Sequence, residues 1–276
     1  MNEGKTVVIT GASDGIGAAA ARQLHRAGHR VVIVGRSPWK TRAVARELGV
    51  DHYPADFTRL DDVRELAAEL NSAYPRIDVL ANNAGGVFGD RTRTVDGFEK
   101  TFQVNHLAPF LLTRLLMDAL IAGHASVIQT SSIGSRMRNA RVVLDDLNLD
   151  KGFGAVRAYS TAKLENILFT RELHRRYNSA GISTAAFHPG NVATSFATES
   201  DSILKYITGN RIGRAFLATP DKGAAQLVWL AQGRPGTDWI SGTYYEKGRP
   251  AKRINPQALD PELAHQLWDR SEQLLR

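Results

Sequence analysis

Hydrophobic and polar positions alternate in blocks along this chain, and the blocks differ in period. Short apolar runs bounded by polar residues or glycine are typical of buried strands, and they lie at 6–10, 30–34, 77–81, 125–129, 183–187 and 240–245, with a shorter strand at 52–54. Between them, apolar residues recur at helical spacing at 15–27, 38–48, 60–74, 105–120, 161–177, 221–230 and 261–275. The chain therefore predicts alternating strands and helices.

Strands that are apolar on both faces, with helices between them, are typical of a parallel sheet covered by helices on both sides. Right-handed crossovers then give a doubly wound sheet. We therefore expect an α/β protein with a Rossmann fold, a mostly parallel seven-stranded sheet and a single domain over residues 1–276. The least regular long segment, about 195–218, is expected to be a loop region, and a terminal helix is expected at about 260–275.

Composition removes several classes of function. The chain of 276 residues has no cysteine, which excludes disulfides, iron–sulfur clusters and cysteine nucleophiles. No apolar run reaches the roughly 18 residues of a membrane span, since Arg114 and Asp118 close the most hydrophobic stretch. The N-terminus lacks the pattern of a signal peptide, so we expect a cytoplasmic protein.

The formal net charge of +7 gives the chain a basic surface. The basic residues are scattered and do not form blocks, and no zinc-finger, RNA-binding or helix-turn-helix pattern accompanies them. We interpret the excess charge as a solvated surface, with an anionic cofactor or an acidic partner protein as the alternatives. No nucleic-acid partner is expected.

A glycine-rich loop joins the first predicted strand to the first predicted helix, with the sequence T-G-A-S-D-G-I-G from Thr10 to Gly17. Glycines let the backbone approach a pyrophosphate closely, and the helix N-terminus offers N–H donors and a positive dipole end. No G-K-[S/T] follows, which excludes a Walker A loop. The position favours dinucleotide binding over a simple tight turn. Contacts are expected from Gly11, Ser13, Asp14, Gly15, Ile16 and Gly17.

The end of the second predicted strand bears on which dinucleotide is bound. An NAD site favours an acidic residue there, because a carboxylate binds the ribose 2′-hydroxyl. The chain instead has Arg36, which is placed to pair with a 2′-phosphate, although a solvent-facing arginine is the alternative. We therefore expect NADP(H), with NAD(H) still possible. Asp14 argues mildly against this preference, since its charge could lie near that phosphate.

Seven short motifs follow one another along residues 5–245. They are T-G-A-S-D-G-I-G, A-D-F at 55–57, N-N-A-G at 82–85, Q-V-N-H around Asn105, T-S-S at 130–132, Y-S-T-A-K at 159–163 and H-P-G-N-V-A-T at 188–194. Together they resemble the short-chain dehydrogenase/reductase family. The D-D-L-N-L-D stretch before Tyr159, the K-L-E-N-I-L-F-T-R-E-L run after it and the late I-S-G-T-Y-Y are most similar to the branch of retinol dehydrogenases and WW-domain oxidoreductases.

The resemblance implies four catalytic residues, which are Asn105, Ser132, Tyr159 and Lys163. Tyr159 and Lys163 are four positions apart and share one face of a helix, so the ammonium, together with the positive nicotinamide of the oxidised cofactor, is expected to lower the tyrosine pKa by about two to three units. Ser132 would hydrogen-bond the substrate carbonyl, in preference to its neighbour Ser131. The backbone carbonyl of Asn105 would hold a water that relays protons to Lys163; the alternative is an asparagine that only kinks its helix.

The resemblance also implies further cofactor contacts. Asp56 and Phe57 should meet the adenine, Asn83, Ala84 and Gly85 should line the adenosine side, and Pro189, Gly190, Val192 and Thr194 should meet the nicotinamide, whose ribose Tyr159 and Lys163 also bind. No metal is expected.

The implied activity is NADPH-dependent reduction of the carbonyl of a hydrophobic substrate, with Tyr159 as general acid. The alternatives are a secondary-alcohol or retinol-type dehydrogenase that works oxidatively and a nucleotide-sensing regulator. The segment at about 195–218 would then be the substrate loop. Arginines in the surrounding loops, which are Arg91, Arg93, Arg136, Arg138 and Arg141, could receive an anionic substrate or face water. The helices at 105–120 and 161–177 resemble those through which many members of the family form dimers and tetramers, so the resemblance implies a homodimer or homotetramer.

Overall fold

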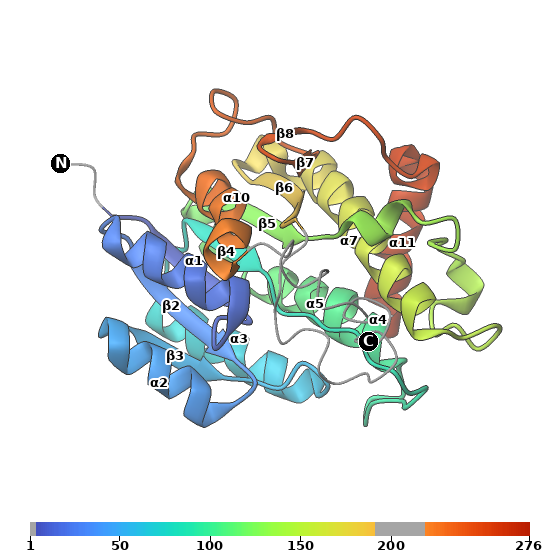
Figure 1. The fold of residues 1–276 in the computed structure, drawn as a ribbon, viewed down its shortest axis with the longest axis horizontal. Helices are drawn as coiled ribbons and strands as arrows, with labels where there is room; N and C mark the ends of the chain where they lie inside the picture. The colour runs from blue at the N-terminus through green and yellow to red at the C-terminus, as the bar shows by residue number, and fades with distance from the viewer. Residues whose placement is uncertain (1–3, 191–218) are drawn as a thin grey trace.

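One eight-stranded sheet runs through the computed structural model, which describes residues 4–190 and 219–276 (Figure 1). The strand order is β3-β2-β1-β4-β5-β6-β7-β8. The strands are β1 (Thr6–Thr10), β2 (Arg30–Gly35), β3 (Asp51–Pro54), β4 (Val79–Asn82), β5 (Ser126–Thr130), β6 (Ser183–His188), β7 (Thr243–Glu246) and β8 (Arg249–Pro250). The order reverses between β1 and β4, which is where doubly wound sheets bind their ligands.

The parallel pairing of the first seven strands confirms the predicted α/β fold class. Val7, Val8 and Ile9 in β1 have no exposed surface, as expected for a strand with helices on both faces. The eighth strand was not predicted. It is two residues long, pairs antiparallel with β7 and is exposed, so it leaves no hydrophobic pattern in the sequence.

Helices cover both faces of this sheet (Figure 1). One face carries α1 (Gly15–Arg26), α2 (Pro38–Leu48) and α10 (Pro220–Gln232), and the other carries α3 (Leu60–Ala73), α5 (Ala108–Leu115) and α7 (Ala155–Tyr177). Shorter helices are α4 (Lys100–Phe102) and α6 (Met117–Ala122). The C-terminal helix α11 (Pro261–Leu274) packs on α7. Within the described ranges, no helix is both long enough and apolar enough to cross a membrane.

The strands also sort the core into two layers. Val8, Val32 and Leu80 face the α3–α5 side, whereas Val7 and Ile33 face the α1–α10 side. Successive side chains of a strand point to opposite faces, so each strand contributes to both layers. Because these strands are parallel, the carboxyl ends of β1, β4, β5 and β6 meet at one edge of the sheet, with mostly buried strands behind them.

Two predicted helices differ from the structure. The helix expected at 105–120 begins at Lys100 and contains η1 (Gln103–Leu107), a π-helical turn, before α5 continues it. Pro109 has no N–H, so the carbonyl of Asn105, four residues earlier, lacks its α-helical donor at this point. The helix expected from residue 161 begins at Ala155 instead, which places Tyr159 in its second turn.

Candidate active site

A cleft of about 510 Å³ opens at the carboxyl ends of the strands. Among the predicted cofactor and catalytic residues, its walls include Gly11, Ser13, Asp14, Gly15, Ile16, Gly17, Arg36, Asp56, Phe57, Asn83, Ala84, Gly85, Ser132, Tyr159, Pro189 and Gly190. Asn105 and Lys163 lie behind this wall, both almost fully buried. The predicted contacts Val192 and Thr194, and the substrate loop at about 195–218, lie outside the described residues.

The glycine loop packs too closely for side chains. A Cβ on Gly17 would stand 2.3 Å from the carbonyl oxygen of Gly11, and a Cβ on Gly11 would stand 2.8 Å from Cα of Ala84. Gly11 also has φ of 65°, which favours glycine. The loop is therefore a bare backbone cradle at the start of α1, and its residues fit the diphosphate of a nicotinamide dinucleotide.

Three charged side chains, those of Asp14, Arg36 and Lys40, lie at the mouth of the cleft. Asp14 caps α1, its Oδ1 accepting from the Gly15 N–H at 2.7 Å. Lys40, in the first turn of α2, approaches Asp14 Oδ2 at 3.7 Å, and both side chains are about half exposed. Arg36 follows β2 and lines the same mouth. Lys40 was not predicted as a site residue. Its position four residues after Arg36, at the start of a predicted helix, could have indicated a second cation at the mouth of the cleft.

Of the predicted adenosine contacts, Asn83 and Phe57 direct their side chains into the protein, whereas Asp56 stays partly exposed. Asn83 turns its side chain into the scaffold, where its Nδ2 donates to the Thr10 carbonyl at 3.0 Å and its Oδ1 accepts from Thr130 at 3.3 Å. Phe57 is 5% exposed and packs into the core. Asp56 remains partly exposed, with Oδ1 accepting from the Thr58 N–H at 3.0 Å. Asn83 thus ties β1, β4 and β5 together beneath the glycine loop.

Ser132 and Tyr159 come together at the inner end of the cleft. The Oγ of Ser132 accepts from the Gly134 N–H at 3.1 Å, and a Cβ on Gly134 would lie 3.5 Å from this oxygen and 3.7 Å from Cε1 of Tyr159. Burial raises the pKa of Tyr159 to about 12, and its hydrogen bond with Ser132 acts in the opposite direction. The neighbouring Ser131 donates its hydroxyl to the Lys163 carbonyl at 2.6 Å, so it is already engaged.

Lys163 lies one turn after Tyr159 and is 1% exposed. Its Nζ donates to the Thr130 carbonyl at 3.0 Å and stands 5.5 Å from the centre of the Tyr159 ring. Burial lowers the pKa of Lys163 to about 7. In the chain by itself, burial raises the pKa of Tyr159 and lowers that of Lys163. The lowering of the tyrosine pKa by Lys163 together with an oxidised cofactor stays a prediction.

Asn105 closes the inner end. Its amide nitrogen donates to the carbonyls of Gly86 and Thr101, each at 2.9 Å, and its Oδ1 accepts from the Gly86 N–H at 3.2 Å. A Cβ on Gly85 would stand 2.5 Å from Asn105 Oδ1 and 3.1 Å from Lys163 Nζ. The structure thus brings Asn105, Gly85 and Lys163 into one buried polar cluster, whose side-chain bonds the sequence did not reveal.

His188 lines the cleft together with Ser132. Its Nδ1 accepts from the Ile133 N–H at 3.3 Å. Burial, with the nearby charges of Arg136 and Lys247, lowers the pKa of His188 to about 4. The neutral ring therefore supports the backbone turn that carries Ser132.

Comparisons with known proteins agree with this geometry. A family model described as short chain dehydrogenase matches residues 5–144. A Streptomyces sp. (strain C5) protein assigned as a daunorubicin C-13 ketoreductase is 43% identical over 97% of this chain and 91% of its own length. Retinol dehydrogenase 14 of Mus musculus is 35% identical over 99% of this chain and 86% of its own length. A crystal structure of an uncharacterised Mycobacterium paratuberculosis protein superposes with a TM-score of 0.77 at 35% identity, covering 98% of this chain and 92% of that one.

Proposed function

This chain belongs to the short-chain dehydrogenase/reductase family, and on that premise we propose that it reduces a ketone or aldehyde of a hydrophobic substrate to the alcohol with NADPH. Its relatives place it on the retinol dehydrogenase-like branch and make it an NAD(P)-dependent oxidoreductase. The observation that carries the finer proposal is the meeting of Ser132, Tyr159 and Lys163 at the inner end of the cleft.

The cofactor would lie along the cleft with its diphosphate on the glycine loop. Arg36 and Lys40 would hold a 2′-phosphate at the mouth, and Lys40 also offsets the negative charge of Asp14. When bound, NADPH supplies the hydride that reduces the carbonyl carbon. The preference for NADPH over NADH rests on these two cations and on the absence of an acidic residue at the end of β2.

The chain's own groups would handle the oxygen of the substrate carbonyl. The hydroxyls of Ser132 and Tyr159 would both donate to it, and their stabilisation grows as negative charge develops there. Tyr159 would then give its proton as the general acid. Its pKa of about 12 keeps the hydroxyl protonated at neutral pH, which suits reduction. Lys163 would return a proton to the tyrosine, resupplied through a water held by the backbone carbonyl of Asn105.

The walls at this end support an uncharged, apolar substrate. Val87 and Phe88 line the cleft, and the exposed side chains of Ile133 and Met137 follow Ser132 within five residues of the sequence. Three of the five nearby arginines are paired within the chain: Arg91 and Arg93 with Asp150 at 3.2 and 2.6 Å, and Arg136 with Glu246 at 3.3 Å. The relative assigned as a daunorubicin ketoreductase favours a polycyclic ketone.

A second candidate is the oxidation of an alcohol by the same residues. The likeness to a retinol dehydrogenase favours it. Oxidation needs the tyrosine as a phenolate, which its raised pKa disfavours near neutral pH.

The homodimer or homotetramer and the cytoplasmic location stay predictions. In this structure α11 packs on α7, one of the helices through which such a dimer was expected to form.

The test is NADPH consumption, followed by absorbance, against a panel of polycyclic and aryl ketones, quinones, retinal and acetoacetyl thioesters. Turnover of a neutral polycyclic ketone that Tyr159→Phe abolishes would support the proposal. Faster oxidation of the matching alcohol by NADP⁺ at neutral pH would favour the second candidate. Tight NADPH binding without turnover of any carbonyl would contradict both and favour a nucleotide-sensing regulator.

A further inference from the structure

The π-helical turn η1 stands between the proposed active site and the C-terminal helix. It spans Gln103–Leu107, and the Ala108 N–H reaches back five residues to the Gln103 carbonyl. Such turns are rare and are frequent at functional sites. Asn105 lies in its middle and faces the cluster around Lys163. The next residue, His106, is equally buried but plays no part in the proposed reaction.

Among the described residues His106 makes one polar contact, and its partner lies 165 positions further along the sequence. Its Nε2 lies 3.0 Å from the hydroxyl of Ser271 in α11. Ser271 donates its own proton to the Leu267 carbonyl at 2.8 Å, so it accepts from the Nε2–H of His106. Both side chains are at most 1% exposed. Burial lowers the pKa of His106 to about 3, so the ring is neutral and carries its single proton on Nε2.

Three aromatic rings fix the orientation of this imidazole. Its centre lies 5.6 Å from Phe102, 6.1 Å from Phe110 and 6.3 Å from Phe169. Its Nδ1 has no hydrogen-bond partner among the described residues. A buried acceptor without a partner is costly, and phenylalanine would fill the same space without that cost. The bond to Ser271 is therefore the polar interaction that a histidine adds here.

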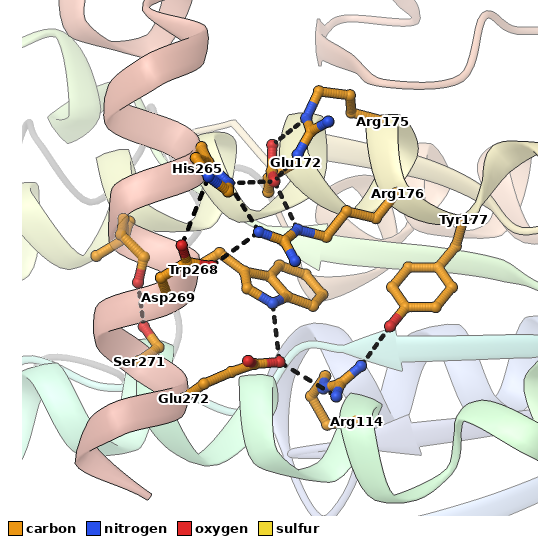
Figure 2. A network of polar contacts seen from close by, with 11 residues as sticks. Arg114, Glu172, Arg175, Arg176, Tyr177, His265, Trp268, Asp269, Ser271 and Glu272 are labelled. Atoms are coloured by element: carbon orange, nitrogen blue, oxygen red, sulfur yellow. Dashed lines mark hydrogen bonds and ion pairs between the residues drawn. The ribbon is translucent and has the colours of Figure 1, made fainter.

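The helix that holds Ser271 is itself firmly anchored (Figure 2). Trp268 is 2% exposed and lies 4.8 Å from the Phe110 ring, centre to centre. Asp269 accepts from Arg176 of α7 at 2.9 Å, and Glu272 pairs with Arg114 of α5 at 3.1 Å. The hydroxyl of Ser271 is thus held in place from both sides of α11, at a fixed distance from η1.

We propose that α11 is a positioning element of the active site, and that the His106–Ser271 hydrogen bond holds η1 in the shape that places Asn105 beside Gly86 and Lys163. The inference rests on the proposed function for its catalytic consequence, because Asn105 matters there only if it serves the proton path to Tyr159. Misplacing a group of this kind by about 1 Å can cost up to about a hundredfold in rate.

The test compares matched variants that differ in one interaction. Ser271→Ala removes the acceptor, and His106→Phe keeps the ring but removes the donor. His106→Gln returns an N–H near the position of Nε2. Gln273→Ala alters an exposed residue of the same helix and leaves both the buried bond and the anchors of α11 intact. For each variant we would measure kcat, KM and the pH profile of reduction, together with hydrogen exchange of the 103–108 amides.

Ser271→Ala and His106→Phe should lower kcat by about tenfold with KM nearly unchanged, shift the pH profile and speed exchange in η1. His106→Gln and Gln273→Ala should stay near the wild type in all three. Equal kcat, pH profile and exchange in Ser271→Ala and Gln273→Ala would overturn the inference. Exchange is measured without substrate, so it decides the positioning role even if no carbonyl is reduced and the proposed function fails.

Discussion

Charged side chains are partly exposed to solvent at the mouth of the cleft and buried at its inner end. At the mouth, Asp14 and Lys40 are about half exposed and their side chains meet in solvent. At the inner end, Lys163 and Asn105 are nearly fully buried, and burial shifts the pKa values of both Tyr159 and Lys163. Water screens charges at the mouth, whereas desolvation dominates inside. The mouth should therefore tune binding by modest factors, and the inner end should govern the rate.

The largest expected effect comes from removing the tyrosine hydroxyl. Tyr159→Phe should lower kcat by about a thousandfold or more, because the general acid is lost. Binding of NADPH, followed by its fluorescence, should hardly change, since the mouth and the glycine loop are untouched. A matched Tyr177→Phe variant alters a tyrosine at the end of α7, far from the cleft lining, and should keep its kcat. A normal kcat in Tyr159→Phe would contradict the claim that the inner end of the cleft governs the rate.

The second-largest expected effect is on NADPH binding, when Arg36 at the mouth of the cleft is removed. Arg36→Ala should weaken NADPH binding by about 10- to 100-fold while NADH binding changes little, because a charge-assisted bond to the 2′-phosphate is lost. Titration calorimetry with both cofactors measures the difference. Arg42→Ala, on the exposed side of α2, controls for the loss of one positive charge. An equal loss for both cofactors would remove Arg36 from the 2′-phosphate site.

A buried acid near the inner end predicts a pH effect on stability. Glu165 is 1% exposed, neither carboxyl oxygen has a partner in the described ranges, and burial together with Glu99 raises its pKa well above the usual range. As pH rises past about 4.5, the unfolded chain releases this proton while the folded chain keeps it, so folding stability falls. Glu165→Gln should therefore gain stability over the wild type, by about 1 kcal/mol or more at neutral pH.

Chemical denaturation at about pH 4 and pH 8 measures this gain. The variant and the wild type should differ least at the acid end and most at the alkaline end. The same substitution at the exposed Glu69 of α3 is the control, and it should show no such trend. A pH-independent difference for Glu165→Gln would mean that the buried carboxyl is not protonated in the folded state.

The smallest expected effect is on NADPH binding, when Lys40 or Asp14 at the mouth of the cleft is changed. Lys40→Ala should weaken NADPH binding by only about three- to tenfold, less so at high salt, because the side chain is half exposed. Asp14→Asn should strengthen it slightly, since a negative charge near the phosphate is lost. A loss in Lys40→Ala as large as in Arg36→Ala would show that the mouth is less screened than its exposure implies.

Much of the fold and of the cofactor cleft was predictable because each element carries a local signal. The apolar runs predicted seven strands, and the glycine loop fell between β1 and α1 as expected. The eighth strand, the π-helical turn and the early start of α7 were missed. A two-residue edge strand has no period. At η1 the sequence shows Pro109, but the side-chain bonds of Asn105 to Gly86 and of His106 to Ser271 join segments that are distant in the sequence. The scaffold role of the Asn83 side chain likewise needs the sheet to bring Thr10 and Thr130 together.

Deuterium transfer tests the central claim most directly. The enzyme is given NADPH deuterated at the position that donates the hydride, together with the best ketone of the panel, and the alcohol is examined by mass spectrometry. The account predicts one deuterium on the carbinol carbon with the wild type and almost no product with Tyr159→Phe at full cofactor occupancy. An unlabelled alcohol, or equal labelled product from Tyr159→Phe, would contradict it.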